Sequence, residues 1–156
     1  MRCVIQRVSK AKVSVDGKVT GEIQKGFMVL LGVMDGDTDE EMRLLAKKVG
    51  EIRIFTDENG KMNLSLSQVG GAVLLVSQFT LCADLAKGRR PSFTLSAPVS
   101  EAERLYLAFG EELKKYGAKD VQYGVFGADM AVELCNDGPV TIVMDTDIWT
   151  KKAVQK

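Results

Sequence analysis

The amino-acid sequence, 156 residues long, contains no histidine. Without histidine the chain cannot form a Ser-His-Asp or Cys-His nucleophile system or a histidine-ligated zinc site, and it lacks the usual general base near neutral pH. An enzyme with this composition must therefore use unusual chemistry.

Cysteine is scarce in the sequence. Cys3, Cys82 and Cys135 are odd in number, far apart and placed in or beside apolar runs. This pattern favours reduced thiols in the protein core over disulfides or a catalytic cysteine.

Signatures of bound ligands are absent as well. The sequence has no G-x-x-x-x-G-K-[ST] loop, no strand-linked G-x-G-x-x-G fingerprint and no G-x-S-x-G motif. Residues 35–40 resemble the start of a calcium loop, but Glu40 stands where that loop needs glycine and Ala46 where it needs glutamate. We therefore expect neither a metal nor a cofactor.

Long apolar runs and net charge are also lacking. The opening residues 1–7 are too polar for a signal peptide, and no later segment approaches the length of a membrane span, so we expect a soluble cytoplasmic protein without a membrane partner. Because 21 Lys and Arg residues balance 21 Asp and Glu residues, any nucleic-acid contact must come from local patches.

What is present predicts one mixed α/β domain over residues 1–156, since 46% of the residues are apolar and 27% are charged. Thr38 with Glu41 and Ser100 with Glu103 have capping-box spacing, which predicts helices over 39–50 and from Ser100 to Gly117. Asp16-Gly17 favours a type I′ hairpin turn. We expect strands at 2–8, 11–16, 19–23, 26–33, 52–55, 62–64, 72–76, 121–125, 130–134 and 140–144.

Two polar segments are candidate sites. Ser77-Gln78-Phe79-Thr80 follows a buried strand, and such strand ends commonly bind ligands, although the hydroxyls could simply satisfy local backbone groups. Lys87, Arg89 and Arg90 lie in a polar loop with Phe93, which suits phosphate contact or an ordinary soluble loop.

A third polar segment, Asn136-Asp137-Gly138-Pro139, joins two apolar β-segments. Gly and Pro beside Asn and Asp are typical turn residues. By spacing alone this segment is therefore predicted to be a turn.

Four segments together resemble the D-aminoacyl-tRNA deacylase family. Each alone is modestly specific, but their order and spacing cover essentially the whole chain and match the family without departure. In chain order they are Met1-Arg2-x-Val4-Ile5-Gln6-Arg7-Val8, Ser77-Gln78-Phe79-Thr80-Leu81, Gly124-x-Phe126-Gly127-Ala128-x-Met130 and Asn136-Asp137-Gly138-Pro139-Val140-Thr141.

The resemblance implies a homodimer with its active site at the subunit interface, where Ser77-Gln78-Phe79-Thr80 of one chain meets a cis Gly138-Pro139 segment of the other. It also implies a β-barrel-like sheet packed on a second sheet and two main helices. Asn136, Met130 and Arg7 become further candidates for substrate binding. Arg7 is the candidate for fixing the Gly138-Pro139 segment through its guanidinium donors, although a surface salt bridge is its plainer interpretation.

The implied substrate makes the missing histidine intelligible. An aminoacyl-tRNA ester is already activated, so hydrolysis chiefly needs stabilisation of a developing oxyanion. We expect backbone N–H groups around Phe79 and Thr80 to supply it, at about 2.7–4 kcal/mol for each well-placed donor. Since no base stands obviously beside the Thr80 hydroxyl, a water assisted by the terminal ribose 2′-hydroxyl is the better nucleophile.

Selectivity is expected to come from exclusion. A rigid wall of Gly138 and Pro139 would reject an L side chain sterically while accepting D-amino acids and glycine. Two alternatives remain open: a hydrolase of free small D-amino-acid esters or peptides, and a catalytically silent RNA-binding module.

Overall fold

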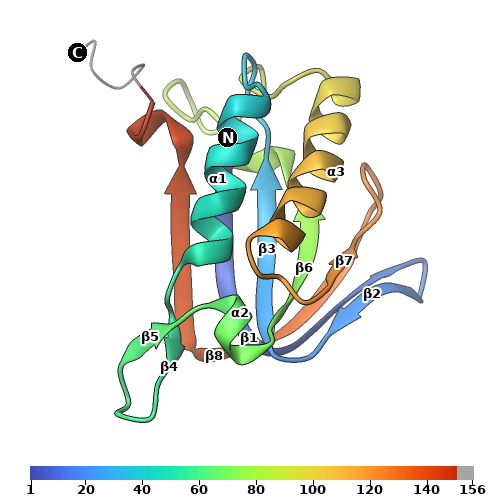
Figure 1. The fold of residues 1–156 in the computed structure, drawn as a ribbon. Helices are drawn as coiled ribbons and strands as arrows, with labels where there is room; N and C mark the ends of the chain where they lie inside the picture. The colour runs from blue at the N-terminus through green and yellow to red at the C-terminus, as the bar shows by residue number, and fades with distance from the viewer. Residues whose placement is uncertain (151–156) are drawn as a thin grey trace.

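The computed structural model describes residues 1–150. Its largest element is a mixed sheet in the order β2-β1-β3-β6-β7, with β8 paired along β1. A separate two-stranded ribbon is formed by β4 and β5 (Figure 1). The strands are β1 (Arg2–Val15), β2 (Lys18–Ile23), β3 (Gly26–Gly32), β4 (Phe55–Thr56), β5 (Met62–Leu64), β6 (Ala72–Ser77), β7 (Val121–Tyr123) and β8 (Ala131–Asp145).

Two long helices, α1 (Asp39–Glu51) and α3 (Val99–Lys115), cover one face of the sheet, as Figure 1 shows. The shorter helical segments are α2 (Leu66–Val69), η1 (Phe79–Cys82) and η2 (Thr146–Ile148). The main core lies between helices and sheet, where Phe27, Leu75 and Phe109 are fully buried. The hydrophobic effect thus fixes the helices against β3 and β6.

The sheet curls toward a barrel because β1 changes partner along its length. Its first half pairs with β3, its second half with β2, and β8 follows its other edge. The far ends of the sheet then meet: a Cβ added at Gly21 of β2 would lie 2.7 Å from the Tyr123 carbonyl oxygen of β7. The curl encloses a second, smaller core that includes Val13, Met28 and Leu74.

Several local predictions are confirmed. Thr38 caps α1 with the full capping box to Glu41. Asp16 and Gly17 both have positive φ, as a type I′ turn requires. The mixed α/β fold with a barrel-like sheet, a second small sheet and two main helices also agrees with the prediction.

The predicted start of the second helix is wrong. The helix begins at Val99 after Pro98, whose carbonyl accepts from the Ala102 N–H, and no side chain caps it. Ser100 therefore lies inside the first turn. The proline fixes the chain direction at this point and replaces the expected serine cap.

Some strand predictions were too short and others too long. Segments 2–8 and 11–16 form one strand, although the exposed Ser9 and Lys10 interrupt the apolar pattern, because pairing with β8 continues past them. Segments 130–134 and 140–144 likewise merge into β8. The predicted strand 52–55 overlaps the two-residue strand β4 only at Phe55, and the predicted strand 121–125 is reduced to the three residues of β7.

The predicted turn at residues 136–139 is also wrong. Gln6 pairs with Thr141 and Val8 with Asn136, so residues 137–140 bulge opposite the single residue Arg7 within one continuous strand. Such a bulge bends a strand and redirects its side chains without ending the pairing on either side.

The cysteine prediction holds for two residues of three. Cys3 and Cys82 are buried free thiols, and burial raises the pKa of Cys3 to about 12. Cys135 is exposed, because the odd-numbered residues of β8 face outward at this point. Among the helices of the described chain, none is long and apolar enough to cross a membrane.

Candidate active site

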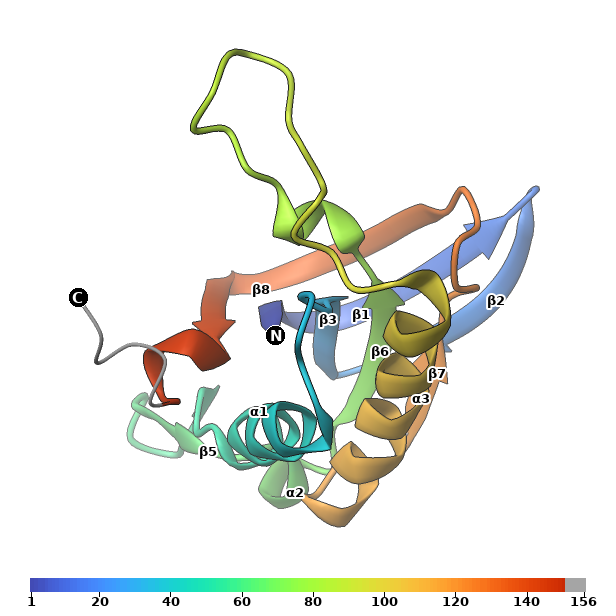
Figure 2. The same ribbon diagram turned by 90° about the horizontal axis from the view of Figure 1, so that it is seen from above.

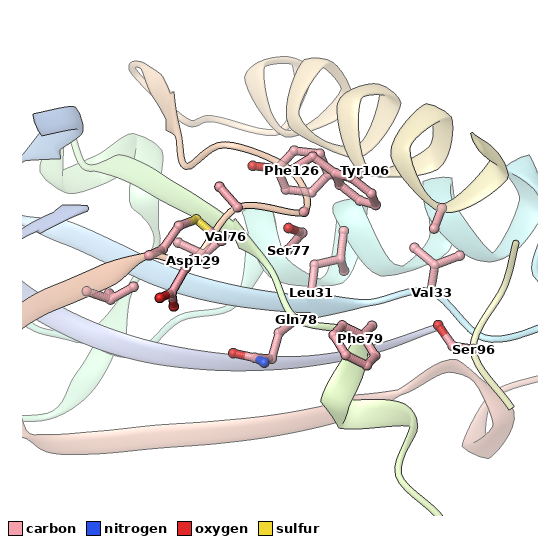
Figure 3. A pocket seen from close by; sticks show the side chains of 15 residues that line it. Leu31, Val33, Val76, Ser77, Gln78, Phe79, Ser96, Tyr106, Phe126 and Asp129 are labelled. Atoms are coloured by element: carbon pink, nitrogen blue, oxygen red, sulfur yellow. The ribbon is translucent and has the colours of Figure 1, made fainter. Parts of the chain in front are cut away.

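A cavity of about 270 Å³ opens at the carboxyl end of β6. Figure 3 shows Ser77, Gln78 and Phe79 on its wall, and Met130 also lines it. The structure thus brings together four of the predicted site residues from segments fifty residues apart in sequence. Its size is close to the lower end of the usual range for ligand pockets.

The backbone beside the cavity leaves two donors free. Where the chain leaves the sheet, the Gln78 N–H donates to the Leu31 carbonyl at 2.8 Å. The next two N–H groups, those of Phe79 and Thr80, begin η1 and have no acceptor within residues 1–150. Two consecutive backbone donors next to the cavity wall therefore lack an acceptor in the described part of the chain.

Close packing fixes this corner. A Cβ added at Gly32 of β3 would lie 2.9 Å from Leu81 Cβ and 3.0 Å from the Gln78 carbonyl oxygen. Only glycine lets η1 approach β3 so closely. The Gln78 side-chain amide also donates to the Thr80 hydroxyl, so this hydroxyl accepts from an amide and contacts no base.

The floor of the cavity includes two aromatic rings from outside the predicted site. Tyr106 of α3 packs on Phe126 with 5.6 Å between ring centroids. The Tyr106 hydroxyl donates to the Leu75 carbonyl at 2.8 Å, and burial raises the pKa of this phenol. Tyr106 therefore stays neutral and ties α3 to β6 directly beneath the site.

Sequence reasoning did not select Tyr106, Ser96, Phe126 or Asp129, all of which line the cavity. Phe126 lies in the Gly124–Met130 motif, and its place there is a signal that could have identified it. Asp129 occupies a position that the same motif leaves unspecified, so the motif gave no reason to choose it.

The basic loop lies next to the cavity mouth. Phe79 is 56% exposed and contacts Phe93 edge-on, with ring centroids 5.0 Å apart. The loop between them projects well away from the rest of the fold (Figure 2). Its exposed cations Lys87, Arg89 and Arg90 have no ion-pair partner among the described residues.

The remaining predicted residues form a separate cluster at the β8 bulge. Arg7 is 8% exposed, and its guanidinium donates to the Asp137 carbonyl at 2.8 Å and to the Ile54 carbonyl at 2.7 Å. The Gly138-Pro139 peptide bond is cis, as the resemblance implies, and both residues are exposed.

Asn136 supports the bulge from inside the strand. Its amide oxygen accepts from the Val140 N–H at 2.7 Å. None of Arg7, Asn136, Gly138 and Pro139 lines the cavity of the same chain. Thr80 is exposed next to Phe79 but does not itself line the cavity. The other predicted site residues form two groups, one at the cavity and one at the bulge.

The model of the D-Tyr-tRNA(Tyr) deacylase family matches residues 4–145. The chain belongs to this family. Deacylases are hydrolases, so the expectation that the chain is an enzyme of this family is confirmed. A D-aminoacyl-tRNA deacylase of Thermosipho africanus is 54% identical over 94% of this chain and 97% of its own. The one of Fusobacterium nucleatum is 56% identical over 94% and 96%.

Solved structures agree with this deacylase-family fold. A c-Myc DNA unwinding element binding protein has a TM-score of 0.87 and 40% identity, covering 93% of this chain and 98% of its own. A probable eukaryotic D-amino acid tRNA deacylase has a TM-score of 0.78 at 19% identity over 92% and 97%. This second likeness concerns the fold alone.

Proposed function

We propose that the protein hydrolyses the ester bond of D-aminoacyl-tRNA, and of glycyl-tRNA, releasing the free amino acid and tRNA. The family membership and the names of the curated relatives support this substrate class. The observation that carries the mechanism is the pair of free N–H groups of Phe79 and Thr80 beside the cavity. They would stabilise the oxyanion as water attacks the ester carbonyl.

The attacking water must lose a proton, and the substrate itself carries a group that can relay it. The Thr80 hydroxyl accepts from the Gln78 amide, which cannot take a proton from it. The described chain also places no histidine there, since the sequence has none. The neighbouring 2′-hydroxyl of the terminal ribose would therefore relay the proton, accepting it from the water and passing its own to the departing 3′-oxygen, while the protein supplies position and electrostatics.

A second copy of the chain would complete the site. The exposed Gly138-Pro139 segment lies outside the cavity of its own chain, and Arg7 and Asn136 hold it in a defined shape. In a homodimer this segment would enter the partner's cavity mouth. Its main-chain atoms would then exclude an L side chain while leaving space for a D side chain or for glycine.

The tRNA would be held by local contacts rather than by overall charge. The molecule has no net charge, but Lys87, Arg89 and Arg90 lie in the projecting loop beside the cavity and have no acidic partners in the described chain. Phosphates of the acceptor end would contact these side chains.

The deciding experiment compares D-tyrosyl-tRNA with free D-tyrosine ethyl ester. Release from tRNA alone supports the proposal, comparable turnover of both favours a small-ester hydrolase, and binding without release favours an RNA-binding module.

A second pair of measurements tests the mechanism. The Thr80→Ala variant should retain substantial activity, whereas a substrate with a 2′-deoxy terminal ribose should not be hydrolysed. Two results together would contradict substrate assistance. The Thr80→Ala variant would fold but lose all activity, and the wild type would hydrolyse the 2′-deoxy substrate at the normal rate.

A further inference from the structure

Arg2, at the start of β1, joins three elements of the fold. Its Nε donates at 2.8 Å to the carboxylate of Asp145, the last residue of β8, and its Nη1 donates at 3.1 Å to the Leu81 carbonyl of η1. Its backbone pairs with Gly32, the glycine against which η1 packs. The guanidinium therefore contacts the short helix that carries the two backbone donors beside the cavity.

This helix has little internal support. In its single turn the Leu81 N–H donates to the Gln78 carbonyl and the Ala83 N–H to the Thr80 carbonyl, both at 3.2 Å. Hydrogen bonds of the 3₁₀ type have poorer geometry than those of an α-helix. Contacts with the rest of the fold must therefore decide where the N–H groups of Phe79 and Thr80 point.

The guanidinium that contacts η1 is itself held in place. Asp145 accepts from Arg2 through Oδ2, and its Oδ1 accepts from the Asp147 N–H at 3.0 Å. The side chains of Arg2 and Asp145 are only 32% and 22% exposed, so water screens this pair less than a fully exposed one. Because the guanidinium is planar and rigid, fixing one of its donors on a carboxylate also directs the others. Arg2 can thus hold the Leu81 carbonyl in one place.

We propose that Arg2 is a positioning residue for hydrolysis. By holding the Leu81 carbonyl at one end of η1, it sets the direction of the Phe79 and Thr80 N–H groups at the other end. Arg2 is not among the residues that line the cavity, so it acts through η1. This inference rests on the proposed function and adds a supporting residue to its oxyanion site.

The expected effect is on the chemical step. Donors aimed at a developing oxyanion act chiefly in the transition state, so displacing them should lower kcat and leave KM nearly unchanged. Removal of one such donor costs a factor of about 10²–10³ in kcat, so donors that are displaced but not removed should cost about tenfold.

Two variants and one control test the role of Arg2. Arg2→Met keeps the aliphatic stem and removes both hydrogen bonds. Asp145→Asn keeps the arginine but removes the charge that fixes it, so its effect should be smaller, about threefold, as for a partly exposed ion pair. The control, Arg104→Met, removes an arginine outside the cavity that pairs with Asp39 and Glu101.

Matched probes separate the transition state from the ground state without hydrolysis. The planar probe is 3′-(D-alanylamino)-3′-deoxyadenosine, a stable amide in place of the ester. In the tetrahedral probe, the 3′-ester of adenosine with the 1-aminoethylphosphonate of matching configuration, an anionic phosphonate replaces the ester carbonyl. Calorimetry should show that the wild type and Arg104→Met prefer the tetrahedral probe, and that Arg2→Met loses about tenfold of this preference, in line with a displaced donor.

Amide NMR spectra give a readout that does not depend on activity. The signals of the Phe79 and Thr80 N–H groups should shift in Arg2→Met and stay in place in Arg104→Met. Unchanged signals, or equal weakening of both probes in Arg2→Met and Asp145→Asn, would overturn the role of Arg2. Release of D-alanine from D-alanyl-tRNA, measured separately, tests the proposed function. A wild type that releases none, while Arg2→Met still loses the preference for the tetrahedral probe, would refute the hydrolase and keep the positioning role.

Discussion

The two sides of the molecule are built differently. On the helix-covered side, Leu105 and Phe109 are fully buried, and Arg104 of α3 pairs with Asp39 of α1. On the side that carries the cavity and the outer face of β8, Phe79 and Val143 remain 56% and 72% exposed. The first side holds the fold together, whereas the second leaves apolar surface and backbone donors available to a ligand or a second copy.

The largest expected effect is on stability, and it distinguishes the buried face of α3 from its exposed face. Phe109→Ala removes a fully buried ring from the core beneath α3 and should lower the free energy of unfolding by about 3–5 kcal/mol. Leu107→Ala, two residues away and 49% exposed, should change it by less than about 0.5 kcal/mol. Urea unfolding measures both values. Similar losses for the two variants would mean that the outer face of α3 is also packed.

The next effect concerns the bulge, where the two sides meet. Arg7→Lys cannot keep both charged hydrogen bonds to the Ile54 and Asp137 carbonyls, so it should cost about 1.5–3 kcal/mol of stability. It should also raise the turnover of L-tyrosyl-tRNA relative to D-tyrosyl-tRNA, because the Gly138-Pro139 segment loses its support.

The control for this prediction is Arg53→Lys, an exposed arginine whose side chain, among residues 1–150, donates only to the Asn63 side chain. It should leave stability and chiral preference close to those of the wild type. If Arg7→Lys is destabilised but keeps full discrimination against L-tyrosyl-tRNA, the bulge is a structural feature and not the wall.

These cases also show what the sequence could and could not predict. The start of α1 was predictable because Thr38 and Glu41 interact within one turn. The bulge was not, because its shape depends on Arg7 contacting Ile54 and Asp137, more than forty and more than one hundred residues away. Local turn chemistry at Gly138-Pro139 suggested a turn, and long-range strand pairing overrode it.

The candidate site likewise contains residues that the sequence predicted and residues that it did not. Ser77-Gln78-Phe79-Thr80 and Met130 were found through strand-end chemistry and the family motifs, and the cavity places Ser77, Gln78, Phe79 and Met130 together. Sequence analysis did not select Tyr106, since only the tertiary contact to Leu75 brings it beneath the cavity.

A smaller effect is expected from the basic loop. Replacing Lys87, Arg89 and Arg90 together by alanine should weaken tRNA binding, and the slope of log affinity against log salt should fall by about 0.7–0.9 for each lost phosphate contact. The control replaces three exposed lysines outside the loop, Lys47, Lys61 and Lys119, and changes net charge equally. Equal losses of tRNA affinity in both triple variants would show that net charge alone matters and that the loop makes no specific contact with tRNA.

The smallest perturbation probes the two sides through the three thiols. Burial raises the pKa of Cys3 to about 12 and also raises that of Cys82, whose thiol donates to the Val33 carbonyl. Because the thiolate is the reactive form, both residues should resist iodoacetamide at pH 8, while the exposed Cys135 of β8 should react. Mass spectrometry should find one modified cysteine in the native protein and three after denaturation in urea. Modification of Cys3 or Cys82 in the native state would contradict a closed core under the helices. Protection of Cys135 would instead show that a second copy covers this part of β8. The interface between the two copies would then include the outer face of β8 as well as the Gly138-Pro139 segment.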